Sequence, residues 1–196
     1  MIRRTQAERS DETTARLVRA ARELFGAGGY AETSIDAIAA AAGVTKGAAY
    51  HHFGGKVALF RAAFVAELET VDGELLKVAA EEPDPWAALR RGCHTFLARC
   101  LDAGFRQIVL LDAPSVLGWE AVREIEYEHM LRVLLGGLRL AVAEGQAPDG
   151  DLPVRAQFVF GALCEAGMLL ARSADPAADL PRLAAEADRF LEALRL

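Results

Sequence analysis

The side chains that could carry chemistry lie in one short segment and are small or polar: Thr45, Lys46, Gly47, Ala48 and His51. At helical spacing these residues share the outward side of one short helix. A helix that exposes such side chains can enter the major groove of DNA, where a lysine, an imidazole and small apolar groups meet the edges of the bases. The chemistry that this segment suggests is recognition of double-stranded DNA.

Two short predicted helices, Ile35–Ala42 and Lys46–His52, would position this segment, and Gly43 separates them. This is the layout of a helix-turn-helix, whose second helix reads the groove. The turn needs a residue that tolerates a positive φ, which Gly43 supplies, and the helix crossing needs a small residue, which Ala39 supplies. The candidate apolar anchors of the pair are Ile35, Ile38, Val44 and Phe53.

The whole sequence predicts helices, because apolar residues recur at intervals of three and four rather than two. A first helix is expected from Ser10, as its N-cap, to Phe25, and the glycines between Gly26 and Gly29 would end it. The later helices are expected over Lys56–Ala80, Trp86–Asp102 (with Asp84 as N-cap and Pro85 first), Trp119–Glu144, Pro153–Ser173 and Leu180–Leu194, with a shorter piece between Gly104 and Pro114. The predicted fold class is all-α.

The composition favours a folded cytoplasmic protein. Hydrophobic residues make up 53% of the 196 residues and charged residues 26%, and no apolar run approaches the roughly 18 residues of a membrane span. No apolar secretory segment follows the N-terminus, and three cysteines without a CxxC exclude a disulfide scaffold and a zinc ribbon. The net charge is −6, yet residues 1–56 hold eight Arg or Lys against six Asp or Glu, which makes this part mildly basic.

The N-terminal motif resembles the DNA-binding signature of the tetracycline-repressor (TetR) family. The matching residues are 33–39 (TSIDAIA), 42–53 (AGVTKGAAYHHF) and Lys56, with 20–25 (AARELF), Gly29 and Tyr30 upstream. The likeness covers roughly residues 11–64 and holds apolar, glycine and aromatic positions at fixed offsets, whereas the remaining two thirds resemble the family only in layout.

The resemblance implies an N-terminal three-helix helix-turn-helix DNA-binding domain at residues 11–56, with its motif at about 34–53. A flexible arm at residues 1–10, basic through Arg3 and Arg4, would precede it. Residues 57–80 would form a linking helix, and residues 81–196 a C-terminal helical ligand-binding and dimerisation domain.

The resemblance also implies which residues contact DNA: Thr33, Ser34, Thr45, Lys46, Gly47, Ala48, Tyr50, His51 and Lys56. Thr33 and Ser34 would give a hydroxyl or a backbone N–H to a phosphate, and Tyr50 and Lys56 would also meet phosphates. Lys46 would meet a phosphate or a base edge, and Ala48 a thymine methyl group. Because Ala48 and Ala49 are small, the recognition helix has few hydrogen-bonding side chains. Sequence readout is therefore expected to depend on Lys46, on His51 and on DNA shape.

The stretch 158–170 is apolar on nearly every side, so every side of that helix must be covered. In a chain of this size a second subunit is the expected cover. The predicted dimer-interface residues are Phe158, Gly161, Ala162, Glu165, Ala166 and Leu169. A two-fold homodimer would read a palindrome whose half-sites lie one helical turn, or a multiple of it, apart.

A sensor pocket is expected among aromatic and sulfur-containing residues in the middle of the C-terminal domain: Trp86, Phe96, Phe105, Trp119, Tyr127, Met130, Phe160 and Cys164. Packing in the core is the competing interpretation for each of them. Their apolar character favours a small lipophilic ligand.

Catalysis is not expected, because the sequence has no GxSxG, P-loop, HExxH or dinucleotide-binding motif. Glu126 and His129 stand three residues apart, a spacing that can bind a metal in four-helix proteins, but no second pair accompanies them, so no metal and no cofactor are predicted. Cys93 and Cys100 share a helical face and could be redox-active, although inert buried thiols are the commoner case.

The expected function is a sequence-specific transcriptional regulator, a homodimeric repressor on a palindromic operator. An unidentified small-molecule inducer would shift the linking helix and release the DNA, as a population shift between two dimer shapes. A transcriptional activator and a non-specific architectural DNA-binding protein remain as alternatives, and the net charge counts against the second. The expected partners are operator DNA, a second copy of the chain and the lipophilic ligand, with no membrane.

Overall fold

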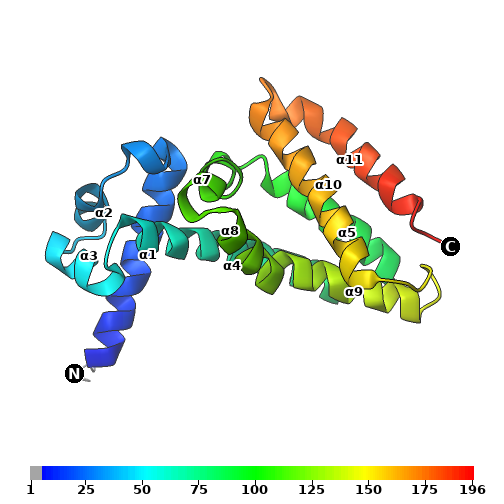
Figure 1. The fold of residues 1–196 in the computed structure, drawn as a ribbon, viewed down its shortest axis with the longest axis horizontal. Coiled ribbons are helices and arrows are strands. Elements are labelled where there is room, and N and C mark those ends of the chain that lie inside the picture. The colour runs from blue at the N-terminus through cyan, green and yellow to red at the C-terminus, as the bar shows by residue number, and fades with distance from the viewer. Residues whose placement is uncertain (1–5) are drawn as a thin grey trace. The chain divides into compact units, whose positions relative to one another are not determined.

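The computed structural model describes residues 6–196, and these form helices without any strand (Figure 1). The prediction of an all-α fold is confirmed. The described residues group into two compact units, one reaching to Glu67 and including Ala103–Trp119, the other made of Leu68–Asp102 and Glu120–Leu196. Arg3 and Arg4 of the expected arm lie outside the described residues.

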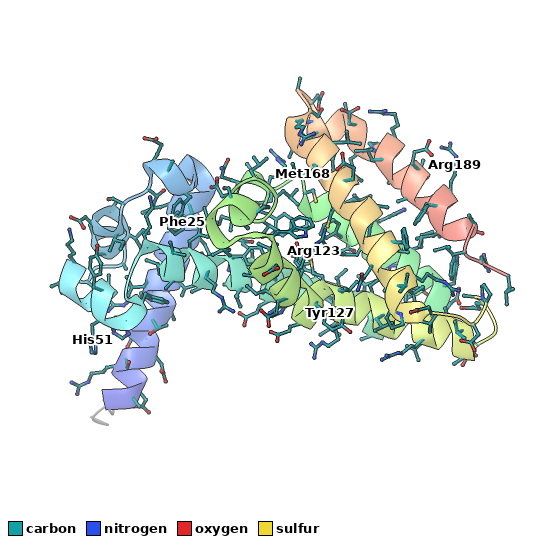
Figure 2. The ribbon with its side chains drawn as sticks, viewed as in Figure 1. Phe25, His51, Arg123, Tyr127, Met168 and Arg189 are labelled. Atoms are coloured by element: carbon teal, nitrogen blue, oxygen red, sulfur yellow. The ribbon has the colours of Figure 1, made fainter. Side chains whose placement is uncertain are left out.

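The first unit is built around aromatic side chains from its two longest helices. Its elements are α1 (Gln6–Glu32), α2 (Ile35–Ala41), α3 (Lys46–Phe53), the beginning of α4 (Lys56–Glu81), α6 (Ala103–Phe105), the π-helix η1 (Arg106–Asp112) and α7 (Ala113–Leu117). Phe25, labelled in Figure 2, and Phe60 are fully buried and meet edge to face, with ring centroids 5.1 Å apart. Tyr30 packs edge to face on the same Phe60 ring at 5.3 Å.

Helix α1 differs from the prediction at both ends. It begins at Gln6, so Ser10 lies inside the helix and the predicted N-cap is wrong. It also continues to Glu32 through a kink at Gly29, where φ is 75° and ψ is 169°. Gly26 lies inside the helix and allows Gly104 to pack closely against it, because a Cβ at Gly26 would lie 2.8 Å from the Gly104 Cα atom. These glycines therefore provide close packing and a kink, not a helix stop.

The segment Ala103–Trp119 belongs to the first unit, although the sequence placed it in the C-terminal domain. Helix α1 packs against both α6 and η1. The side chain of Asp112 reaches back to α1 and accepts a hydrogen bond from the Tyr30 amide at 2.7 Å. The grouping depends on contacts between residues about eighty positions apart, which helical periodicity does not encode.

The second unit is a helical bundle with α5 near its centre. Its elements are the rest of α4, α5 (Pro85–Arg99), α8 (Trp119–Glu126) from Glu120 onward, the π-helix η2 (Tyr127–Leu131), α9 (Arg132–Ala143), α10 (Leu152–Arg172) and α11 (Pro176–Glu192). Helix α5 packs against α9, α10 and α11, and α10 packs against α9 and α11 (Figure 1). Among the side chains fully buried in this bundle are Leu97, Leu138 and Leu170.

Two Asp-Pro pairs begin helices in this unit. Asp84 caps α5 with Pro85 in the first turn, as predicted. Asp175 caps α11 in the same way, accepting a hydrogen bond from the Ala178 amide at 3.1 Å. The predicted start at Leu180 is therefore wrong, because Asp175 and Pro176 begin the helix instead of turning the chain. Pro181 lies inside α11, near its beginning.

The prediction of helix from Trp119 to about Glu144 is confirmed, with a π-helical turn in its middle. Within η2 the backbone of His129 is non-helical, with φ and ψ both −107°. Further on, a Cβ at Gly137 would lie 2.6 Å from a Leu89 methyl carbon. Gly137 thus serves the close approach of α9 to α5, whereas a Cβ at Gly136 would meet nothing within 4 Å.

Within the described residues, α10 has the length and apolar composition that crossing a membrane would require. A helix in the core of a soluble protein meets the same criterion, and α10 packs against α5, η2, α9 and α11 of its own unit. The criterion therefore carries little weight for α10.

Candidate nucleic-acid interface and ligand cavity

Helices α2 and α3 form a capped helix-turn-helix. The Ser34 hydroxyl caps α2 by accepting from the Ala37 amide at 3.1 Å, and the Thr45 hydroxyl caps α3 by accepting from the Ala48 amide at 3.2 Å. Gly43 adopts a φ of 65° in the turn, and Ala39 is buried at the crossing. The predicted roles of Gly43 in the turn and of Ala39 at the helix crossing are confirmed.

The predicted anchors divide into two groups. Ile35 and Ile38 are buried, whereas Val44 and Phe53 are half-buried. In α3 only Ala49 is buried, so most of the surface of this helix is free to approach a partner. His52 is half-buried, and its Nδ1 atom lies 3.1 Å from the Thr14 hydroxyl of α1.

The open side of α3 carries most of the predicted contact residues. Lys46, Gly47, Tyr50 and His51 are exposed, and Ala48 is half-buried. Figure 2 labels His51 on α3. The Tyr50 side chain is 45% exposed although it is aromatic. An exposed set of this kind, one ammonium, one phenol and one imidazole beside small residues, fits contact with phosphates and base edges.

Lys46 is held by an acid of the preceding helix. Its ammonium nitrogen lies 2.8 Å from a carboxylate oxygen of Asp36 in α2, and both side chains are exposed. The hydrogen bond to Asp36 raises the pKa of Lys46 above its ordinary value. Lys46 is therefore charged, and a DNA phosphate would compete with Asp36 for it.

Lys56 opens α4 in a fixed position. Its ammonium group donates to the Ala31 carbonyl at 3.2 Å and lies 4.2 Å from the centroid of the Tyr30 ring. The side chain remains half-exposed, so the charge stays at the surface of the first unit.

One predicted contact needs a correction. Thr33 is buried, and its hydroxyl donates to the carbonyl oxygens of Gly29 at 2.8 Å and Leu24 at 3.1 Å. The hydroxyl thus closes the end of α1 and does not face a phosphate. Ser34, one residue later, is exposed and supplies the cap.

A large apolar cavity lies in the second unit, with a volume of about 1100 Å³. It is lined by α4, α5, η2, α9 and α10, with Leu75, Leu89 and Val133 among the apolar residues and Glu81, Glu82, Arg132 and Glu144 among the charged ones. Of the predicted pocket residues, Phe96, Met130 and Phe160 line it. Cavities of this size and character hold drug-sized ligands.

The other predicted pocket residues lie elsewhere. Phe105 is fully buried in the first unit, and Trp119 and Tyr127 are exposed. Trp86 is buried beside the cavity but packs into the bundle, where its indole N–H donates to Glu192 at 3.2 Å. Cys164 is half-buried and does not line the cavity. Aromatic character alone therefore does not distinguish residues that line the cavity from residues of the core. The lining also includes small residues such as Gly92 and Gly136, which leave space for a ligand.

The outer sides of α10 and α11 expose apolar residues. Phe158 is 71% exposed and Leu169 is 48% exposed, and Ala162 and Glu165 are exposed between them. Gly161 and Ala166 of the predicted interface are half-buried. A groove of about 670 Å³ between α10 and α11 is lined by Ala162, Glu165, Ala166, Leu169 and Phe190, among others.

Glu126 and His129, the spacing of which could suit a metal, each contact another residue of the chain. Glu126 is buried and bonded to Arg123 at 3.1 Å, and burial raises the pKa of Glu126 to about 7. His129 instead contacts Asp72, with Nδ1 2.9 Å from the carboxylate. Burial raises the pKa of the Cys93 thiol to about 12, so this thiol is protonated and unreactive near neutral pH.

The fold and the exposed recognition helix define a helix-turn-helix transcriptional regulator. The family described as "Bacterial regulatory proteins, tetR family" matches residues 17–63, and "Tetracyclin repressor-like, C-terminal domain" matches residues 86–194. The chain belongs to the TetR family of transcriptional regulators.

Several relatives are similar over most of their length. The HTH-type transcriptional regulator TtgR of Pseudomonas putida is 32% identical, over 100% of this chain and 97% of TtgR. The transposon Tn10 TetC protein of Escherichia coli is 32% identical over 75% of each chain. A solved TetR-family regulator from Pectobacterium atrosepticum is 32% identical and covers 98% of each chain, with a TM-score of 0.86. RolR, solved in complex with resorcinol, shares the fold at 22% identity and a TM-score of 0.71.

Proposed function

We propose that the protein is a ligand-released repressor that binds a palindromic operator as a homodimer, acts in the cytoplasm and has no catalytic activity. The observation that carries the proposal is the open side of α3. Thr45 caps this helix, only Ala49 is buried, and Lys46, Tyr50 and His51 are exposed together. Non-specific binding would require a strongly positive surface, and the chain has a net charge of −6.

The cavity of about 1100 Å³ supports the sensing part of the proposal. Its lining includes Leu75, Leu76 and Ala79 of α4, and the same helix begins with Lys56 in the unit that holds α3. A ligand that prefers one arrangement of α4 over another would shift the population of DNA-binding shapes.

The exposed apolar residues of α10 and α11 support the homodimer. An apolar surface that includes a phenylalanine exposed to 71% is typical of a protein interface. Two-fold pairing of these helices would also cover the side of α10 that its own unit leaves open.

The test is a salt-titrated binding assay on the DNA upstream of the protein's own gene, with Lys46→Ala and Tyr50→Ala. Each substitution is expected to weaken binding by about tenfold, and Lys46→Ala should reduce the salt dependence as a phosphate contact is lost. Lys77→Ala and Tyr127→Ala are the matched controls, because both side chains are exposed in the second unit.

A two-fold symmetric footprint with loss in the α3 variants alone would support the proposal. Equal loss in the controls, or binding that random DNA removes as well as the operator does, would contradict it. If this DNA is not bound, a selection of bound fragments from the whole genome locates the operator, and the same variants are tested on it.

A further inference from the structure

The cavity of the second unit has one buried, apolar end. Phe96 of α5 and Phe160 of α10 line it, with their ring centroids 6.2 Å apart. Cys93 and Leu163 stand three residues from these two rings on the same helices, and both are buried and line the cavity. None of these side chains is charged, so this end suits the apolar body of a ligand.

The opposite end lies where α4 leads into α5 and where α9 ends. Gln146, two residues after Glu144, accepts a hydrogen bond from the Trp86 amide at 3.0 Å. This bond holds the end of α9 beside the beginning of α5. Glu81 and Glu82 come directly before that beginning, at the end of α4. The three glutamates all line the cavity, and they belong to the same end of it.

The two ends are far enough apart to hold different parts of one ligand. Val133 and Glu144 both line the cavity and are eleven residues apart along α9 and its cap, which corresponds to about 16 Å. Between the ends the cavity opens to solvent, because its lining includes Leu76, which is 53% exposed, and Leu140, which is 60% exposed. Leu140 stands one turn before Glu144, so a ligand that covered this leucine would reach the carboxylate.

The charge of the lining is predominantly negative. Three glutamates stand against one arginine, Arg132, and Arg132 begins α9 whereas Glu144 follows its end. Arg91 lies 3.6 Å from Glu81 and 3.3 Å from Glu82 and partly compensates these two acids. Glu144 has no ion pair among the residues that the structure describes. An organic cation is therefore attracted to this end, since opposite charges attract and Glu144 is not yet paired.

We propose that the cavity binds an elongated amphipathic cation, with its charged head at Glu81, Glu82 and Glu144 and its apolar body at Phe96 and Phe160. The proposal rests on the sensing function proposed for this cavity. Because Glu81 and Glu144 are exposed, the head keeps part of its hydration there, and the cost of removing water from a charge stays small. A ligand with a carboxylate head would be repelled from the same end.

The test measures calorimetric binding of three probes that share a decyl chain: decyltrimethylammonium, decanol and decanoate, each below the concentration at which it forms micelles. At low salt the wild-type protein is expected to bind the ammonium about threefold to tenfold more tightly than the alcohol, because ion pairs of exposed carboxylates are individually weak. This preference should shrink as salt rises. Decanoate should bind most weakly.

The informative variants remove the acidic charges and keep the side-chain shape. Glu144→Gln should lower the preference for the ammonium by about twofold to threefold and leave the affinity for decanol unchanged. The triple variant Glu81→Gln, Glu82→Gln, Glu144→Gln should abolish the preference. Glu69→Gln changes an exposed acid of α4 that does not line the cavity, and this matched control should retain the full preference.

A further pair of variants shows where the probes bind. Gly136 lines the cavity, and a Cβ there would meet nothing within 4 Å, so Gly136→Leu fills part of the cavity without a clash. It should weaken the binding of all three probes. Gly73→Leu is the matched control, because Gly73 is an exposed helical glycine with equally open space and lies outside the lining.

Equal binding of the three probes, or tighter binding of decanoate, would overturn the inference and leave the sensing function standing. A preference for the ammonium that survives in the triple variant, or binding that Gly136→Leu does not weaken, would overturn it as well. The sensing function has its own readout, the release of operator DNA by the ammonium. The expected preference without such release would contradict the sensing function alone, and failure of all three probes to bind would contradict both.

Discussion

The backbone amide of Tyr30 donates to the carboxylate of Asp112 across 2.7 Å, and this bond ties the end of α1 to the end of η1. Gly29, directly before Tyr30, has a positive φ, and a Cβ there would lie 3.1 Å from the Gln107 side chain. The kinked end of α1 therefore packs against η1 and is hydrogen-bonded to it inside the first unit.

Asp112→Ala is expected to weaken this contact between α1 and η1. The Tyr30 amide loses a charged acceptor in a half-buried place, which should lower the free energy of unfolding by about 1–3 kcal/mol. Urea unfolding followed by circular dichroism measures the loss. Asp11→Ala, an exposed acid of α1, is the control and should change stability little. A stable Asp112→Ala protein would show that the amide finds water instead.

Asp36→Asn is expected to raise the affinity for operator DNA. The substitution removes a negative charge beside α3 and frees the Lys46 ammonium, which Asp36 holds at 2.8 Å. The gain should be about threefold to tenfold at low salt and shrink as salt rises, because exposed charges are screened. Titration of labelled operator measures it, with Glu120→Gln as a remote charge control. An unchanged affinity would mean that Lys46 stays with Asp36 on DNA.

Glu126 is expected to make stability depend on pH. Burial raises its pKa in the folded state to about 7, above the ordinary value of 4.5. Between these values the unfolded chain releases the proton more readily, so the carboxyl lowers stability progressively as pH rises from about 4.5 to about 7. The free energy of unfolding of Glu126→Gln, relative to that of the wild type, should therefore be higher at pH 8 than at pH 5. At every pH the variant lacks the charge pair with Arg123.

The measurement is urea unfolding of both proteins at several pH values between about 4 and 8. Glu124→Gln, exposed on the same helix, should follow the wild-type profile. Parallel profiles for the wild type and Glu126→Gln would show that Glu126 does not titrate in this range.

Phe158→Arg and Leu169→Glu are expected to separate the proposed dimer. Each places a charge on the exposed apolar side of α10, where a partner copy would have to bury it at a cost of several kcal/mol. Size-exclusion chromatography with light scattering measures the mass. Trp119→Arg changes an equally apolar, exposed residue outside α10 and should stay dimeric. Dimers in both α10 variants would place the interface elsewhere.

Much of the first unit could be predicted from the sequence because its determinants are local. Gly43, Ala39 and the hydroxyl of Thr45 act within a few residues of their own position, so their spacing indicates their role. The Asp-Pro pair at α5 is equally local. The hydroxyl of Thr33 was misassigned because it donates to carbonyls of α1, and this depends on how α1 ends.

The cavity could be predicted only in part. Phe96, Met130 and Phe160 were anticipated from their apolar character, but the same character marked Phe105 and Trp119, which belong to the first unit. Outside the cavity, the contact of Asp72 with His129 was not anticipated either, because a single acid inside an apolar helix gives no sign of its partner. Its neighbour His129 is 57 residues away in the sequence.

The sequence alone determined the helical class, the helix-turn-helix and the family, because periodicity, caps and turn glycines act over a few residues and leave a readable pattern. Only the tertiary structure decided that residues 103–119 join the first unit, that three of the expected pocket residues line one cavity, and that Asp72 meets His129. These features depend on contacts between distant segments, and contact between distant segments is set by packing of the whole unit rather than by local residue preference.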